Sequence, residues 1–155
     1  MLTIYYTPHM LPLSVPIKGV SLGESHGVAW DSLGNVYSWG EIKDGKLGHH
    51  MDETSTQTML DTPTKIAALR DHKMIMAICG STYSCGLNSK GEILVWGHFD
   101  KGSGGVQKGR RQEQLKPRVL QPLNSSHVTF VKITGFGRHN AAIDKDGELY
   151  TWGDK

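Results

Sequence analysis

Short apolar runs separated by polar, glycine-containing turns recur along this chain. Three of them, Val36-Tyr-Ser-Trp39, Ile93-Leu-Val-Trp96 and Leu149-Tyr-Thr-Trp152, are β-branched, aromatic or otherwise apolar at nearly every position. That composition is typical of β-strands. Because the apolar residues do not alternate with polar ones, we expect both faces of each strand to be covered, as in stacked sheets.

A turn of the same design precedes each run. It opens with an aspartate or asparagine and has a glycine three residues later; the pairs are Asp31 and Gly34, Asn88 and Gly91, and Asp144 and Gly147. The Asx side chain can accept a hydrogen bond from the backbone two residues on, and glycine adopts the positive φ that closes a type I turn with a bulge. Each run is therefore predicted to be the second strand of a tight hairpin.

The hairpins recur at a nearly constant interval. Trp39 and Trp96 are 57 residues apart, and Trp96 and Trp152 are 56 apart. In each hairpin the tryptophan lies thirteen positions after a histidine or tyrosine; these residues are His26, Tyr83 and His139. Self-similarity at such a period predicts a repeat architecture, in which each unit buries its apolar faces against its neighbours.

Each unit is expected to contain a further strand that begins at a proline, a position that strands tolerate at their first residue or on a sheet edge. Pro63-Thr-Lys-Ile66 and Pro117-Arg-Val-Leu120 have this form, and Pro12-Leu-Ser-Val15 resembles them. We therefore divide the chain into a lead-in or the end of a preceding unit, two complete repeats and an incomplete third. Their boundaries are 1–16, 17–66, 67–120 and 121–155.

These motifs resemble the repeat of the regulator of chromosome condensation family, whose units look like I-A-C-G-x-x-H-S-x-A-L-x-x-x-G-x-V-Y-x-W-G-x-x-x-x-G-Q-L-G followed by P-x-x-V. The matching segments are Ala77-Ile-Cys-Gly80, Gly34-Asn-Val-Tyr-Ser-Trp39-Gly40 and Gly45-Lys-Leu-Gly48. The glycine and tryptophan residues of the three copies are Gly34, Trp39, Gly40, Gly91, Trp96, Gly97, Gly147, Trp152 and Gly153.

The resemblance covers about residues 12 to 155 and has informative departures. Lys46 stands in place of the glutamine of G-Q-L-G, the second unit loses this element and has Gly102-Ser-Gly-Gly105 instead, and the third unit has Gly135-Phe-Gly137 where one glycine is usual. Members of the family fold as β-propellers with seven blades of four antiparallel strands. The resemblance therefore implies an all-β fold with about three blades of a seven-bladed ring.

Three blades in an open arc would leave two apolar faces uncovered, which is unfavourable. We expect the remaining blades to come from a longer chain, with self-association as the alternative. Charge is nearly balanced, with 17 Lys and Arg against 15 Asp and Glu, so the whole chain has no field that favours nucleic acid or membrane. No apolar run approaches the length of a membrane span. The two unpaired cysteines favour an intracellular location, in nucleus or cytoplasm.

No residue pattern indicates an active site, a cofactor or a metal. Eight histidines are present, but none has the spacing of a ligand cluster, and neither a phosphate-binding loop nor a nucleophile motif appears. We expect His26 and His139, which recur at one repeat position, to have their rings satisfied inside the blades. Trp39, Trp96 and Trp152 are expected in the blade core, and no residue is predicted to be catalytic.

The segments between the hairpins, residues 41–62 and 98–116, are polar and variable, and such loops often bind partners. Candidate contact residues are His49, His50, Asp52, Lys108, Arg110 and Arg111. The basic stretch 101–118 is either a solvated loop or a patch for DNA phosphates, chromatin or an acidic protein. The favoured hypothesis is a non-catalytic protein-interaction propeller. The alternative, implied by the resemblance, is guanine-nucleotide exchange on a Ran-like small GTPase with chromatin association.

Overall fold

The computed structural model describes residues 6–50, 55–100, 102–105, 113–120 and 128–154. These residues form β-strands and two single-turn 3-10 helices, η1 (Lys43–Gly45) and η2 (Ala67–Leu69). The strands are β1 (Ile17–Leu22), β2 (His26–Asp31), β3 (Val36–Glu41), β4 (Met59–Lys65), β5 (Met74–Cys79), β6 (Tyr83–Asn88), β7 (Ile93–His98), β8 (Glu113–Val119), β9 (Phe130–Phe136), β10 (His139–Asp144) and β11 (Leu149–Gly153).

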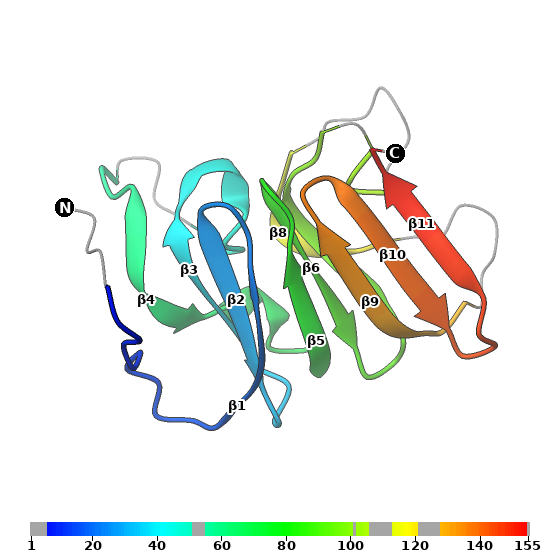
Figure 1. Cartoon of the computed structure of the whole chain (residues 1–155), viewed down its shortest axis with the longest axis horizontal. Helices are drawn as coiled ribbons and strands as arrows, with labels where there is room; N and C mark the ends of the chain where they lie inside the picture. Colours follow the sequence, from blue (N-terminus) through cyan, green and yellow to red (C-terminus); the bar gives the residue numbers. More distant parts are fainter. Residues whose placement is uncertain (1–5, 51–54, 101, 106–112, 121–127, 155) are drawn as a thin grey trace.

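The strands make three separate antiparallel sheets that lie side by side (Figure 1). Blade 1 has the order β1-β2-β3-β4, blade 2 has β5-β6-β7-β8, and blade 3 has β9-β10-β11. Every sheet is a simple meander in which each strand pairs with the next one along the chain. The prediction of an all-β fold built from four-stranded antiparallel sheets is therefore confirmed.

The three hairpins share one register. His26 pairs with Gly40, Tyr83 with Gly97, and His139 with Gly153. These glycines have φ of 109°, 111° and 108°. A Cβ at any of them would lie 2.0–2.6 Å from backbone atoms of the facing strand or its loop. The glycine after each tryptophan is thus required both by its positive φ and by close backbone contact.

The turns have the geometry expected from the Asx and glycine pairs. In the first, Asp31 Oδ1 accepts hydrogen bonds from the backbone N–H groups of Leu33 and Asn35, both at 2.9 Å. Asn88 and Asp144 accept the equivalent pairs at 2.9–3.0 Å. The glycines three positions after these Asx residues, Gly34, Gly91 and Gly147, have φ of 90°, 79° and 85°.

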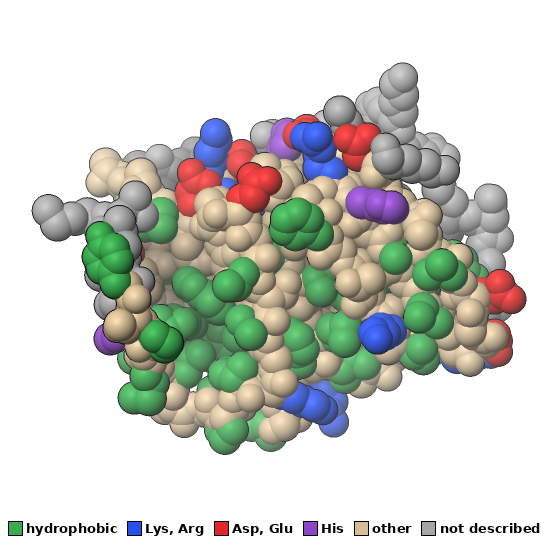
Figure 2. Space-filling view, viewed as in Figure 1, with side chains coloured by type: hydrophobic (Ala, Val, Ile, Leu, Met, Phe, Trp, Pro, Cys, Tyr) green, Lys and Arg blue, Asp and Glu red, His purple; other side chains and the backbone are tan. Residues whose placement is uncertain are grey.

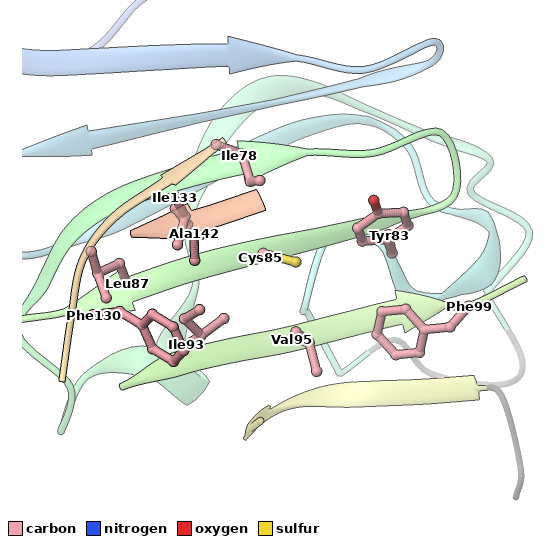
Figure 3. Packing of buried hydrophobic residues seen from close by; sticks show 10 residues of the cluster. All are labelled: Ile78, Tyr83, Cys85, Leu87, Ile93, Val95, Phe99, Phe130, Ile133 and Ala142. Carbon is pink, nitrogen blue, oxygen red and sulfur yellow. The ribbon is translucent and has the colours of Figure 1, made fainter. Parts of the chain in front are cut away.

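Apolar side chains pack between the sheets in two clusters. Blade 1 contributes Val28 and Val36 to the first cluster, where they meet residues of blade 2 that include Trp96. The second cluster joins the other face of blade 2 to blade 3, and Figure 3 shows side chains from both blades converging in it. Its members are Ile78, Tyr83, Cys85, Leu87, Ile93, Val95, Phe99, Phe130, Ile133 and Ala142.

Blade 2 is thus covered on both faces, and in β7 every residue except the terminal His98 is buried. The expectation of two covered faces is wrong for β11, where Leu149 is 67% exposed and Thr151 is also exposed. The described chain places no sheet on that side of blade 3. For a similar reason Trp39 is only partly buried, on the uncovered face of blade 1, whereas Trp96 is fully buried. Trp152 is partly buried as well.

The connections between strands lie at two opposite edges of the blades (Figure 1). We call the upper one in the figure the loop edge; among the described residues it holds 23–25, 42–50, 55–58, 80–82, 99–100, 102–105 and 137–138. The lower one, the turn edge, holds residues 32–35, 66–73, 89–92, 120, 128–129 and 145–148. Among the helices of the described ranges, none is long and apolar enough to cross a membrane.

Candidate functional site

Charged and histidine side chains gather along the loop edge, with apolar side chains below it (Figure 2). Glu24, Lys43, His50 and Arg138 are exposed there and come from three different connections of blades 1 and 3. Arg138 forms an ion pair with Asp154, with Nε 3.5 Å from Oδ2. This edge is the candidate contact surface of the described chain.

Of the six predicted contact residues, the structure describes two. His50 is exposed. His49 is half-buried and its Nε2 lies 2.9 Å from Ser38 Oγ. Because Ser38 Oγ donates its hydrogen to the carbonyl of Leu47 at 2.8 Å, His49 donates from Nε2, and burial lowers the pKa of this imidazole. His49 therefore holds its own loop onto β3.

The other four predicted contact residues, Asp52, Lys108, Arg110 and Arg111, lie outside the described residues. So do residues 101 and 106–112 of the basic stretch 101–118. Of its cationic side chains, that of Lys116 is exposed and that of Arg118 is partly buried.

An ion pair between a buried lysine and a partly exposed glutamate anchors the loop that follows β3. The Lys46 side chain is only 2% exposed and its Nζ lies 2.5 Å from Glu41 Oε2. Ser25 Oγ donates to the same carboxylate oxygen at 3.0 Å. The hydrogen bond from Lys46 is the largest cause that holds the pKa of Glu41 below its ordinary value. Since a buried ammonium is costly without a partner, the pair fixes the position of this loop.

The same loop rests on the next blade. η1 contacts β7 and β8 of blade 2, and the carbonyl oxygen of Lys46 accepts a hydrogen bond from Ser84 Oγ at 2.9 Å. A Cβ at Gly48 would lie 3.0 Å from the indole Nε1 of Trp96. The G-x-L-G segment of blade 1 is therefore part of the junction with blade 2.

Residues 102–105 play the equivalent part at the second junction. The carbonyl oxygen of Ser103 accepts hydrogen bonds from Asn140 Nδ2 and from Trp152 Nε1, both at 3.0 Å. Gly102 and Gly105 have positive φ, as do Gly45 and Gly48. Although the sequence element G-Q-L-G is lost in the second unit, its backbone geometry is present.

A second polar contact recurs at both junctions. It joins the first residue of β2 or β6 to the second residue of the matching strand in the next blade, which is β6 or β10. His26 Nε2 lies 2.9 Å from Ser84 Oγ, and Tyr83 OH donates to Asn140 Oδ1 at 2.8 Å. Ser84 already donates to the carbonyl of Lys46, so His26 donates from Nε2 and its Nδ1 carries no hydrogen. Burial, followed by the charge of Lys46, lowers the pKa of His26 to about 4.

The structure corrects the prediction for His139, which is exposed. It occupies the position of His26 and Tyr83, but no described sheet lies against it. The sequence analysis did not single out Ser84 or Asn140, and it noted Lys46 only as a departure from the repeat pattern. Ser84 and Asn140 each follow directly the residue that marks the repeat position, so aligning the three hairpins would have singled them out as a polar pair in otherwise apolar strands.

Both cysteine thiols are deeply buried. Burial raises the pKa of the Cys79 thiol to about 12 and raises the pKa of Cys85 as well. These thiols are therefore poor nucleophiles. Among the described residues, no group of three His, Cys, Asp or Glu side chains could hold a metal ion.

Comparison with known proteins assigns the repeats. The model of the regulator of chromosome condensation (RCC1) repeat matches residues 34–87. The chain is made of RCC1-type repeats. The human E3 ubiquitin-protein ligase HERC2 is 34% identical over 143 residues, which are 91% of this chain and 3% of that protein. The ultraviolet-B receptor UVR8 of Arabidopsis thaliana is 30% identical over 139 residues, 90% of this chain and 30% of the receptor.

Solved structures show the same fold. Prp20p of Saccharomyces cerevisiae superposes with a TM-score of 0.70 at 27% identity, over 89% of this chain and 32% of that one. Human WBSCR16 gives a TM-score of 0.74 at 20% identity, over 94% of this chain and 35% of that one. The RCC1-type repeats thus form blades of a β-propeller, as the resemblance implied. The chain spans about a third or less of each of these four relatives.

Proposed function

We propose that these RCC1-type repeats are part of a propeller that binds other proteins through its loop edge and has no chemistry of its own. The observation that carries this proposal is that one set of polar side chains holds the loops and blades together, while another set is exposed at the loop edge. Lys46, Glu41, Ser84 and His26 hold loops and blades together. Exposed side chains of both charges lie around these anchored loops, and polar residues on a rigid scaffold suit specific protein contacts.

Two solved structures support a protein as the partner. The structure of Prp20p was reported together with its binding to Gsp1p and histones. A second structure holds yeast RCC1 (Prp20) bound to Kap60, and its RCC1 chain is 26% identical to this one. Those partners belong to Prp20p, and they support the general expectation that RCC1-type blades present protein-binding surfaces.

The test compares the two edges by charge exchange. The loop-edge variant Glu24→Lys/Lys43→Glu and the turn-edge variant Lys90→Glu/Glu148→Lys each keep the net charge and each change only side chains that the structure leaves exposed or partly exposed. Each pair of substitutions would be placed in the full-length protein, and the proteins crosslinked to each variant in cells would be quantified by mass spectrometry. We expect the loop-edge variant to lose partners that the turn-edge variant retains. Loss confined to the turn-edge variant would overturn the proposal.

A second candidate function is guanine-nucleotide exchange on a Ran-like small GTPase, combined with association with chromatin. The family resemblance and the reported binding of Prp20p to Gsp1p and histones favour it. An exchange factor acts by binding the nucleotide-free GTPase more tightly than the loaded one. Accelerated release of labelled GDP in the presence of the full-length protein supports this function. No acceleration across a panel of small GTPases rejects it and leaves the binding proposal standing.

A further inference from the structure

The connection between β9 and β10 differs from its counterparts in blades 1 and 2 at one position. In β9, Phe136 pairs with His139, three residues further along the chain. Gly23 and Gly80 hold the same position in blades 1 and 2, because each donates from its backbone N–H to the carbonyl oxygen three residues on, at 2.8 Å in both. Phe136 is the additional residue of the segment Gly135-Phe-Gly137, where one glycine is usual.

Between two docked blades this position has room only for glycine. A Cβ at Gly80 would lie 2.2 Å from the ring of Tyr83. A Cβ at Gly23 would lie 2.5 Å from the carbonyl oxygen of Gly80 in the next blade. An aromatic ring of the same blade and the backbone of the following sheet thus fill the space that a side chain would need. Packing between blades therefore does not account for a phenylalanine here.

Phe136 is largely open to solvent. It is 75% exposed, the highest value among the large apolar residues of the described strands. It lies at the loop edge, where β9 and β10 are joined (Figure 1), and Arg138 and His139 are exposed next to it. Aromatic and arginine side chains supply much of the binding free energy in protein interfaces, where the ring typically fills a pocket of the partner.

The backbone that carries these side chains is fixed from both sides. The carbonyl oxygen of Gly137 accepts hydrogen bonds from the N–H and the hydroxyl of Ser81 in blade 2, at 2.9 and 3.3 Å. The carbonyl oxygen of Arg138 accepts a hydrogen bond from the N–H of Asp154 at 3.0 Å, and their side chains form an ion pair. A backbone held in this way loses little conformational freedom when a partner binds.

We propose that Phe136 is the apolar anchor of a partner-binding site at the loop edge of blade 3, and that its ring enters an apolar pocket of a different protein. A phenyl ring forms no hydrogen bonds, so it contributes to binding by leaving water for apolar surface. The opposite charges of Arg138 and Asp154 beside it suit a protein surface of mixed charge rather than a polyanion. This inference rests on the proposed function and identifies one residue on which partner binding depends.

A photoreactive analogue identifies what lies against the ring. In the full-length protein, Phe136 would be replaced by p-benzoyl-phenylalanine, which keeps the phenyl ring. The matched control has the same replacement at Leu33, which is 76% exposed at the turn edge of blade 1. After irradiation in cells, mass spectrometry locates the crosslinked residues.

We expect the analogue at position 136 to form adducts with another protein about fivefold more often than the analogue at position 33. The adduct sites in that protein should line an apolar pocket. Adducts with the protein's own chain or with a second copy of it, or equal yields at the two positions, would overturn the proposal.

Substitutions distinguish a contact residue from a structural one. Phe136→Ser and the control Leu33→Ser would be compared in the full-length protein by thermal melting and by the affinity for the crosslinked partner. We expect similar melting temperatures for the two variants, since both change exposed side chains. Phe136→Ser should bind the partner about tenfold more weakly than Leu33→Ser does. A lower melting temperature for Phe136→Ser alone would show that the ring packs within the protein, against the proposal.

The same variants separate this inference from the proposed function. If Glu24→Lys/Lys43→Glu loses partners while Phe136→Ser keeps them all, the loop edge binds proteins but Phe136 is not their anchor, and only the inference is overturned. If neither variant loses a partner, the proposed function fails together with it.

Discussion

The buried imidazole of His26 makes stability depend on pH in a defined window. His26 is 4% exposed, donates from Nε2 to Ser84 and lies near the ammonium of Lys46. Its Nδ1 is buried and has no hydrogen-bond partner among the described residues. A proton added to Nδ1 would therefore be both desolvated and repelled by Lys46, and acid should weaken the junction between blades 1 and 2.

The magnitude follows from linkage. The pKa of His26 is lowered from 6.5 in the unfolded chain to about 4 in the folded one, so the unfolded state binds more protons throughout that interval. Stability from the neutral ring is fully present above the unfolded pKa and is lost as pH falls toward the folded pKa. Between about pH 7 and pH 5 the expected loss in the free energy of unfolding is about 1.8 kcal/mol.

Urea unfolding of the chain at about pH 7, 6 and 5 measures this loss. The matched variant is His26→Gln, whose amide can still donate to Ser84 but does not titrate. We expect the variant to lose about 1.8 kcal/mol less than the wild type over this interval. His49→Gln serves as a second control, because burial also lowers the pKa of His49. Parallel pH profiles for wild type and His26→Gln would refute the reasoning.

Three further predictions concern stability and reactivity. Glu41→Gln should lower the free energy of unfolding by about 2 kcal/mol, because it leaves the buried Lys46 ammonium without a counter-charge. Lys46→Gln should lower the free energy of unfolding by less. Equal losses for the two variants in denaturant titrations would contradict this. Gly91→Ala should destabilise more than Gly147→Ala: both have positive φ, but a Cβ meets a neighbour at 2.4 Å only at Gly91, so similar melting temperatures would count against the packing argument. Cys79, whose pKa is raised to about 12 by burial, should react with Ellman's reagent at the rate of unfolding, and rapid labelling of the native protein would disprove its burial.

Local patterns in the sequence were sufficient to predict the hairpins. Each turn is formed by residues within four positions of Asp31, Asn88 or Asp144, because the Asx side chain accepts hydrogen bonds from the backbone N–H groups two and four residues on. The thirteen-residue interval to the tryptophan has no insertion, so register follows from the turn. Strand type and pairing were therefore predictable because both depend on neighbours along the chain.

Burial was not predictable in the same way, because it depends on what lies across the sheet face. Tyr83 and His139 occupy one repeat position, yet Tyr83 is fully buried and His139 is exposed. For Lys46 the difference from expectation is the reverse, because a residue expected to be exposed is buried. In the sequence it belongs to a polar loop, but the loop folds back onto blade 2 and removes the side chain from water. Neither outcome follows from the residue type or from the pattern around it.

The loop edge depends on the stacking of the blades as well. The loop after β3 is held by Ser84 of the following blade, and residues 102–105 are held by Asn140 and Trp152 of blade 3. Each loop is thus positioned by the blade that comes next. The described parts of these two loops are therefore anchored by junctions that lie within the described chain. Partner binding at these two loops should therefore be coupled to the packing of each blade on the next.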